Sequence, residues 1–244
     1  NFPRLFMWGR LMAEITLYTA PTANGFKISI ALEEMAISYS VRCLDFQKNE
    51  QKTPEYLALN PNGRIPAIVD HRNNEYVLSE SGAILLYLAE RSGMLFPESL
   101  DARYEAMQWL MFQMSAVGPM MGQAMFFQRI AAPKGIVDEY ATKRYVDESR
   151  RLLTIVNERL SERDYLCGDY SIADIAMFPW ARAHRWGNID IDDLVHLREW
   201  FELIESRDAV QRGIRVPTGE IPIAYSSDND LSEATRQNAN KYDA

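Results

Sequence analysis

The sequence predicts an α/β domain followed by an all-helical domain. Three observations lead to this fold class: strand-like and helical runs alternate through residues 13–93, no strand-like run follows residue 97, and long helical patterns begin at residue 101. Strands that alternate with helices are typical of an α/β unit with a parallel pair, whereas consecutive helices favour a bundle. A chain of 244 residues, 47% of them hydrophobic, is long enough for two modest domains.

The first half is predicted to have the element order β-α-β-α-β-β-α, which is the thioredoxin-like pattern. The helix after the first strand has a mixed periodicity and is assigned from its length and its Ala-Leu-Glu-Glu-Met content. Thr53 caps the next helix and Pro54 takes its first position. In order, the elements are a strand at 15–18, a helix at 26–35, a strand at 39–46, a short helix from 53, a hairpin of 66–70 and 76–78, and a helix at 80–92.

Two short motifs in this half indicate a ligand site. Ile65 precedes Pro66 at the start of a strand, which suggests a cis peptide and leaves the backbone of Ile65 free to pair with an extended peptide. Glu80 and Ser81 open an apolar helix, where an acidic side chain, a hydroxyl and free helical N–H groups meet. This combination suits a ligand with both a carboxylate and an amine. The alternative interpretation is a tight turn followed by a capped helix.

The second half is predicted to be helical at 101–127, 137–160, 171–185 and 193–205. Ser171 and Asp174 form a capping box with a structural role, and Pro179 should kink the helix that they open. The predicted division is a leading or added segment at 1–12, an α/β domain at 13–93, a linker at 94–100, a helical domain at 101–213 and a polar tail at 214–244.

Composition excludes several classes of function. The formal net charge of −8 argues against nucleic acid or an anionic membrane as a partner, and no apolar run is long enough to span a bilayer. Only two cysteines are present, Cys43 and Cys167, with no CxxC motif. They are expected to be small buried apolar residues in a protein of the reducing cytoplasm. The histidines show no metal-ligand spacing, so no metal is expected.

Residues 64–67 (Arg-Ile-Pro-Ala), the Glu80-Ser81 pair, the helical second half and residues 171–174 (Ser-Ile-Ala-Asp) together resemble the glutathione transferase superfamily. Within it, residues 20–27 (Ala-Pro-Thr-Ala-Asn-Gly-Phe-Lys) look like the nu class, the Ure2-like disulfide-bond oxidoreductases of bacteria. The resemblance covers nearly all of residues 13–213. It implies a glutathione transferase fold, a thioredoxin-like domain plus a helical bundle, in a cytoplasmic homodimer that binds reduced or disulfide-linked glutathione.

The resemblance also implies which residues contact glutathione: Thr22, Asn24, Gln51, Arg64, Ile65, Glu80, Ser81 and Arg144. Glu80 should face the γ-glutamyl ammonium, Ser81 its carboxylate, and Gln51 the glycyl end. Arg144 lies in a charged helix, so a solvated face is its alternative interpretation. Lys27, Lys48 and Lys52 could add positive potential, although solvated surface charge is the preferred interpretation for each.

Thr22 and Asn24 are expected to be the catalytic residues. The thiolate of glutathione is the reactive species, and hydrogen-bond donors near the start of a helix stabilise it. A simple turn at residues 24–25 is the alternative. Tyr18 lies in the strand before the loop and is expected to pack. Because the loop contains no cysteine, the working sulfur would come from glutathione itself.

The predicted activity is reduction of disulfides with glutathione, with weak reduction of peroxides. The alternatives are conjugation of glutathione to small electrophiles and a binding or regulatory module without turnover. A small-molecule disulfide or electrophile is therefore the expected partner, besides glutathione and a second copy of the chain.

Overall fold

The first half of the molecule is built on one four-stranded sheet. The structure is a computed structural model that describes residues 13–221. The strand order is β2-β1-β3-β4, in which β1 and β2 are parallel and the other neighbouring pairs are antiparallel. The strands are β1 (Ile15–Thr19), β2 (Tyr39–Cys43), β3 (Ala67–Asp70) and β4 (Tyr76–Ser79). The element order confirms the predicted α/β domain.

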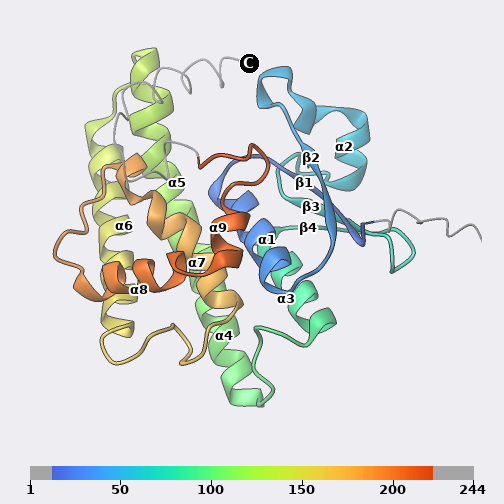
Figure 1. Ribbon diagram of the computed structural model, residues 1–244. Helices are drawn as coiled ribbons and strands as arrows, with labels where there is room; N and C mark the ends of the chain where they lie inside the picture. The colour runs from blue at the N-terminus through green and yellow to red at the C-terminus, as the bar shows by residue number, and fades with distance from the viewer. Residues whose placement is uncertain (1–12, 222–244) are drawn as a thin grey trace, which may run out of the picture.

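Helices cover both faces of this sheet (Figure 1). Helices α1 (Ala23–Glu34) and α3 (Ser81–Ser92) lie between the sheet and the helical half, and α2 (Pro54–Leu59) lies on the other side. Thr53 caps α2 as predicted, because its hydroxyl accepts from the N–H of Tyr56. Two short 3-10 turns, η1 (Phe46–Lys48) and η2 (Glu50–Lys52), follow β2, which ends three residues earlier than predicted.

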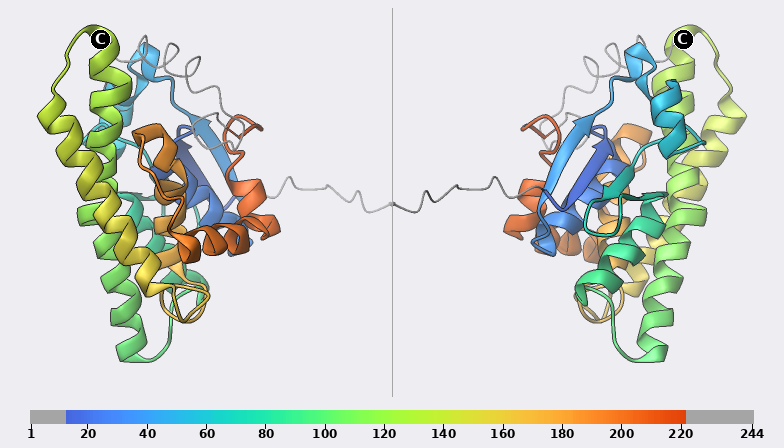
Figure 2. Two further views of the ribbon diagram at one scale, coloured as in Figure 1. Left: turned by 90° about the vertical axis from the view of Figure 1, so that its left-hand side faces the viewer. Right: turned by 90° about the vertical axis from the view of Figure 1, so that its right-hand side faces the viewer.

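The second half is helical and is dominated by two long antiparallel rods, which Figure 2 shows side by side. The first rod combines α4 (Leu100–Phe112), a π-helical turn η3 (Gln113–Val117), α5 (Gly118–Phe126), a second π turn η4 (Phe127–Ala131) and a 3-10 turn η5 (Ala132–Lys134). The second rod is α6 (Glu139–Arg159). The predicted single helix at 101–127 is therefore interrupted. Gly118 and Pro119 directly follow η3, and Pro133 follows η4, but a π turn adds one residue to the helical repeat, which periodicity alone does not reveal.

Helix α7 (Ile172–Arg182) passes through the centre of the helical half, and nearly all its side chains are buried. The predicted capping box is present. Asp174 accepts from the N–H of Ser171 and also from the N–H of Leu166 and the indole of Trp200. Burial raises the pKa of Asp174 to about 6. Its carboxylate thus joins three segments of the bundle, which agrees with a structural role.

Helix α1 is the element that joins the two halves, because it packs against α3, α7 and α9 (Asp208–Gly213). The sequence analysis did not predict α9. Ser29 donates to the carbonyl of Gly213, and the ion pairs Arg207–Glu34 and Arg212–Glu33 fasten α9 further. The remaining elements are the 3-10 turn η6 (Ala183–Gly187) and α8 (Val195–Glu205).

The expectation that both cysteines are buried is wrong. Cys43 is exposed at the end of edge strand β2, and Cys167 is only partly buried. Strand β2 has a neighbour on one side only, and its last four residues are exposed. The predicted segment 1–12 and the part of the predicted tail after residue 221 lie outside the described residues.

Candidate functional site

The sheet register brings three separate chain segments to one edge. Tyr18, near the end of β1, pairs with Ala67 at the start of β3, and Ala67 pairs with Ser79 at the end of β4. The loop to α1, the peptide before β3 and the start of α3 therefore emerge next to one another. Most of the predicted ligand residues lie in these three segments.

The entrance of α1 presents a hydroxyl at a helix N-terminus. Thr22 is the N-cap, and its Oγ accepts from the N–H of Gly25 at 3.3 Å. Its own proton therefore remains free to be donated. Gly25 is required here because a Cβ at this position would lie 2.3 Å from the carbonyl oxygen of Ala20. The absence of a side chain lets the loop at Ala20 pack closely against the first turn of α1.

Asn24 is oriented by a residue that the sequence analysis did not identify. The indole Nε1 of Trp180, on α7, donates to Asn24 Oδ1 at 2.8 Å. An indole N–H only donates, so it selects the oxygen of the amide and turns the NH₂ group away. The indole lies against Gly118 and Gly122 of α5, where a Cβ would meet the ring at 3.6 and 3.5 Å. Asn24 is thus left with its donor group available to a ligand.

The peptide before β3 has the predicted form. The Ile65–Pro66 bond is cis. The carbonyl of Arg64 accepts from the Tyr56 hydroxyl at 2.6 Å and from Asn60 Nδ2 at 2.7 Å, which fixes the backbone on one side. Ile65 makes no hydrogen bond with another residue in the described part of the chain. Its N–H and C=O are available to an extended partner, and the side chain of Arg64 is exposed.

Gln51 lies beside this peptide. It is in η2, and its backbone oxygen would be 2.8 Å from a Cβ on Gly63, which precedes Arg64. Its Oε1 is buried and has no partner among residues 13–221. An unpaired buried acceptor costs free energy, so a donor from a ligand would be stabilising here.

Glu80 and Ser81 open α3 in an unusual conformation. Glu80 is exposed, holds φ of 71° and occupies the N-cap position without a side-chain capping bond. A strained non-glycine residue of this kind is a recognised indicator of a functional position. Ser81 is 97% buried, and the first N–H groups of α3 lie beside it, with the positive end of the helix dipole. An anion next to an ammonium group fits this corner.

Lys27 corrects a prediction, since it is not a solvated surface charge. The side chain is 1% exposed, and its Nζ donates to Ser81 Oγ at 3.3 Å and to Gln113 Oε1. Burial lowers its pKa to about 7, against the opposing effect of Glu80. Lys48 and Lys52 are exposed, as predicted.

One of the predicted glutathione contacts lies apart from this cluster. Arg144 is exposed on α6, and no hydrogen bond or ion pair connects it with the other predicted residues in the described chain. Tyr18 packs as predicted, with its ring 6.0 Å from that of Tyr56. The structure therefore brings together seven of the eight predicted residues, in the loop to α1, in η2, before β3 and at the start of α3.

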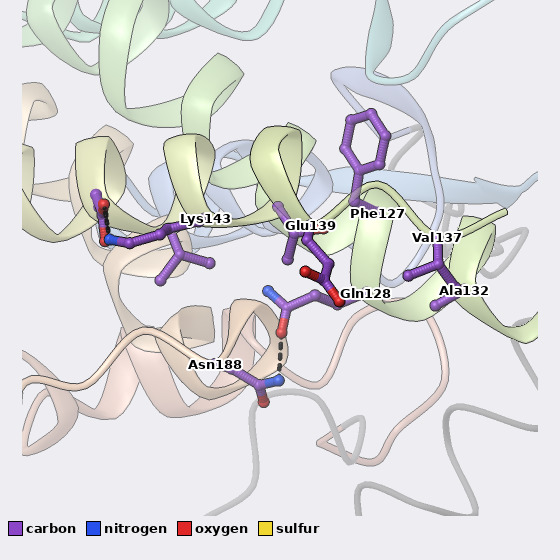
Figure 3. Close-up of a pocket in the computed structure, with 10 residues that line it drawn as sticks. Phe127, Gln128, Ala132, Val137, Glu139, Lys143 and Asn188 are labelled. Atoms are coloured by element: carbon purple, nitrogen blue, oxygen red, sulfur yellow. Dashed lines mark hydrogen bonds and ion pairs between the residues drawn. The ribbon is translucent and has the colours of Figure 1, made fainter.

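A separate pocket of about 400 Å³ lies in the helical half (Figure 3). It is formed between the end of the first rod and the start of α6, with Phe127, Ala132 and Val137 as apolar walls. Gln128 accepts a hydrogen bond from Asn188 across its floor. None of the predicted site residues lines this pocket.

The arrangement at the sheet edge can bind a peptide-like anion and stabilise negative charge. One free backbone segment, one acidic side chain, one hydroxyl at a helix start and two polar donors at the entrance of α1 converge there. Thr22 and Asn24 could stabilise negative charge on an atom bound there, but neither is a base that would remove its proton. A ligand sulfur at that position would be held as a thiolate.

Comparison with known proteins gives consistent matches over both halves. Residues 13–90 match the glutathione S-transferase N-terminal domain, and residues 119–208 match the glutathione S-transferase C-terminal domain. The disulfide-bond oxidoreductase YfcG of Escherichia coli (strain K12) is 42% identical over 205 residues, which is 82% of this chain and 94% of that protein.

Two solved structures are similar in fold and sequence. A glutathione transferase from Pseudomonas putida, with one glutathione disulfide bound per subunit, has a TM-score of 0.79 and 40% identity, and the match covers 86% of this chain and 94% of that one. A glutathione transferase from Burkholderia graminis, with two glutathione molecules bound per subunit, has a TM-score of 0.79 and 42% identity, over 85% of this chain and 90% of that one. None of the described helices has the length and hydrophobicity to span a membrane.

Proposed function

This chain belongs to the glutathione S-transferase family, and we propose that it is an enzyme that reduces disulfides with bound glutathione. The main support for this proposal is the arrangement of Thr22 and Asn24 at the start of α1. Trp180 holds Asn24 with its NH₂ group free, and Thr22 retains a free hydroxyl proton beside it. The relative from Escherichia coli, named as a disulfide-bond oxidoreductase, supports the same activity.

The proposed binding mode assigns each end of glutathione to one segment. The backbone of Ile65 pairs with the cysteinyl unit, Glu80 binds the γ-glutamyl ammonium, and Ser81 with the first N–H groups of α3 binds its carboxylate. Gln51 and the exposed Arg64 bind the glycyl end. The neighbours crystallised with glutathione or its disulfide support glutathione as the ligand.

The proposed chemistry uses the sulfur of glutathione. Thr22 and Asn24 donate to that sulfur and favour its thiolate at neutral pH. The thiolate attacks one sulfur of a substrate disulfide, a mixed disulfide forms, and the other substrate sulfur leaves as a thiolate. A second glutathione thiolate then attacks the mixed disulfide, which yields glutathione disulfide and the second substrate thiol. Two electrons pass from two glutathione molecules to one disulfide.

A panel of three acceptors tests this activity. The purified protein is assayed with glutathione against hydroxyethyl disulfide, cumene hydroperoxide and an aromatic halide. We expect fastest turnover with the disulfide and weak turnover with the peroxide. Turnover of the halide alone would support conjugation instead. Glutathione binding without turnover of any acceptor would indicate a binding module.

Asn24→Ala tests whether Asn24 stabilises the thiolate of bound glutathione. We expect turnover of the disulfide to fall by at least about tenfold, because a hydrogen bond to a charged sulfur contributes about 1.5–3 kcal/mol. The circular dichroism spectrum and melting temperature should stay near those of the wild type, since Asn24 is only partly buried. Unchanged rates would remove Asn24 from the mechanism.

The same proposal includes a nu-class, cytoplasmic homodimer with Arg144 as a further glutathione contact. Large apolar side chains on β4 and α4 are exposed, among them Tyr76, Tyr104 and Met111, which supports burial against a second copy. Sedimentation equilibrium should give twice the mass of 28.1 kDa. Arg144→Gln should weaken glutathione binding, and unchanged affinity would exclude that contact.

A further inference from the structure

One lysine of the described chain, Lys27, is buried with only neutral hydrogen-bond partners. It lies on α1, one turn after Asn24, and is 1% exposed. Its Nζ donates to three atoms: Ser81 Oγ, Gln113 Oε1 and Met114 Sδ. All three partners are neutral. No carboxylate forms an ion pair with Lys27 within residues 13–221.

A buried charge with only neutral partners destabilises the fold. Ammonium groups are rarely fully buried without an anion, because the desolvation cost amounts to several kcal/mol. Replacing such a lysine by a methionine of similar shape would remove the cost. The position therefore suits a charge that is used when a ligand supplies the anion.

Ser81 connects Lys27 with the place where an anion would bind. Its Oγ is 3.3 Å from Lys27 Nζ, and its backbone N–H belongs to the open first turn of α3. A carboxylate bound to the Ser81 hydroxyl would lie within roughly 6 Å of the ammonium, with no water layer between them because both side chains are buried. Opposite charges this close in a dry site attract strongly.

We propose that Lys27 is the buried counter-charge for the ligand carboxylate held at Ser81, so that binding of glutathione takes up a proton at Lys27. This inference rests on the proposed function, since it concerns the γ-glutamyl carboxylate of the same ligand. It assigns to α1 a second role, in which one helix stabilises the sulfur at its start and the carboxylate one turn later.

The neighbouring charges leave Lys27 free for this role. Glu80, at the start of α3, is the charged group that acts on it, and it favours the protonated form. The π turn η3 offers only Gln113 and Met114. The charged groups of the other helices packed on α1, which are engaged elsewhere, are Asp174, Arg182, Asp208 and Arg212.

The state of Lys27 before binding follows from its burial. Its pKa of about 7 leaves it mostly neutral at pH 8 and protonated at pH 5.5. A carboxylate nearby raises this pKa, so the ligand complex binds more protons than the free protein does above pH 7. The same linkage predicts that affinity falls as the pH rises from 7 to 8.5.

Titration calorimetry with S-methylglutathione tests the inference. This probe retains both carboxylates and the ammonium but has no thiol to release a proton. Binding is measured at pH 5.5 and pH 8 in two buffers with different ionisation enthalpies, for the wild type and for Lys27→Met. For the wild type we expect uptake close to one proton per site at pH 8 and close to none at pH 5.5.

The variant isolates the lysine from other groups. Any proton taken up by the ammonium of the probe is common to both proteins, so the difference between them reports Lys27. Lys27→Met should lose the uptake at pH 8 and bind about tenfold more weakly at pH 5.5. Lys143→Met is the matched control, because Lys143 is exposed and paired with Asp147, and it should keep the wild-type uptake.

The outcomes separate the two proposals. Equal uptake in the wild type and in Lys27→Met, or no uptake by the wild type at pH 8, overturns the role of Lys27 while the binding itself stands. Absence of uptake by the wild type at pH 8 overturns this role even if Lys27→Met does not fold. Absence of binding by the wild type at either pH overturns the proposed function, and the inference falls with it.

Discussion

At the residue scale, the proposed reactivity depends on the orientation of the side-chain amide of Asn24. Asn24 offers either an acceptor or a donor to the cleft, and the local sequence does not select between them. The indole of Trp180 does, because it only donates. A residue 156 positions away thus sets the chemistry at the start of α1.

Trp180→Phe tests this orientation. Phenylalanine keeps a smaller aromatic ring and removes the N–H, so the Asn24 amide is free to rotate. We expect the turnover rate to fall about tenfold and the pKa of the bound thiol to rise, while the affinity for S-methylglutathione changes little. The pH profile of turnover and calorimetry measure the two effects.

Trp200→Phe is the control for Trp180→Phe. Its indole donates at 3.1 Å to Asp174, away from the entrance of α1. This variant should lower the melting temperature and leave the pKa of the bound thiol unchanged. A thiol pKa that is unchanged in Trp180→Phe as well would contradict the orienting role.

At the scale of single elements, the junction between β4 and α3 shows how a strained residue serves binding. Glu80 holds φ of 71° at the helix start, a conformation that costs about 1–3 kcal/mol for a non-glycine residue. Ser79, which pairs with Ala67, is the last residue of β4, so Glu80 lies directly between the end of the sheet and the first turn of α3.

Glu80→Gln removes the charge of this side chain and keeps its size. We expect the affinity for glutathione to fall by about tenfold or more, because the ligand ammonium loses its anionic partner. Fluorescence or calorimetric titration measures the effect. Glu90→Gln, at the exposed far end of α3, should bind normally. Normal binding by Glu80→Gln would contradict the assignment of the ammonium site.

The docking of α9 on α1 depends on the absence of one side chain. A Cβ on Gly213 would lie 2.7 Å from the backbone of Ile30. We expect Gly213→Ala to lower the free energy of unfolding by about 1–3 kcal/mol, which is typical of overpacking, in urea denaturation. Gly122→Ala is the control, since its Cβ would make only ordinary contacts. Equal stability of both variants would contradict this packing.

At the scale of the whole molecule, Lys27 is a buried ionisable group between the two halves, and its charged form lowers the stability of the fold. It connects α1, α3 and the π turn of the first rod. The unfolded chain holds this proton up to pH 10.5, whereas the folded chain releases it near pH 7. Between these values the unfolded state binds more protons at Lys27, so the contribution of this group to the free energy of unfolding increases with pH.

Urea denaturation at several pH values measures this effect. We expect the free energy of unfolding of the wild type to rise relative to that of Lys27→Met between pH 7 and pH 9, by up to about 1.4 kcal/mol per pH unit. Lys143→Met should follow the wild type throughout. Parallel curves for the wild type and Lys27→Met would show that Lys27 keeps its proton in the fold.

The sequence by itself determined most of the elements and the segments that form the site, although not α9 or the π turns of the first rod. Local signals suffice for these: the caps at Thr53 and Ser171, the proline after Ile65 and the Glu80-Ser81 helix start each act through neighbours in the chain. The two-domain fold and the edge where Thr22, Ile65 and Ser81 meet were predictable for this reason.

Only the tertiary structure decided which groups at that edge are buried, oriented or charged. Lys27, Trp180 and the exposed Cys43 have no local signature, because their environments come from residues 54 to 156 positions away or from the lack of a neighbouring strand. The π turn that presents Gln113 to Lys27 is equally invisible to helical periodicity. Burial and hydrogen bonding across the two halves, rather than composition, set the electrostatics of this site.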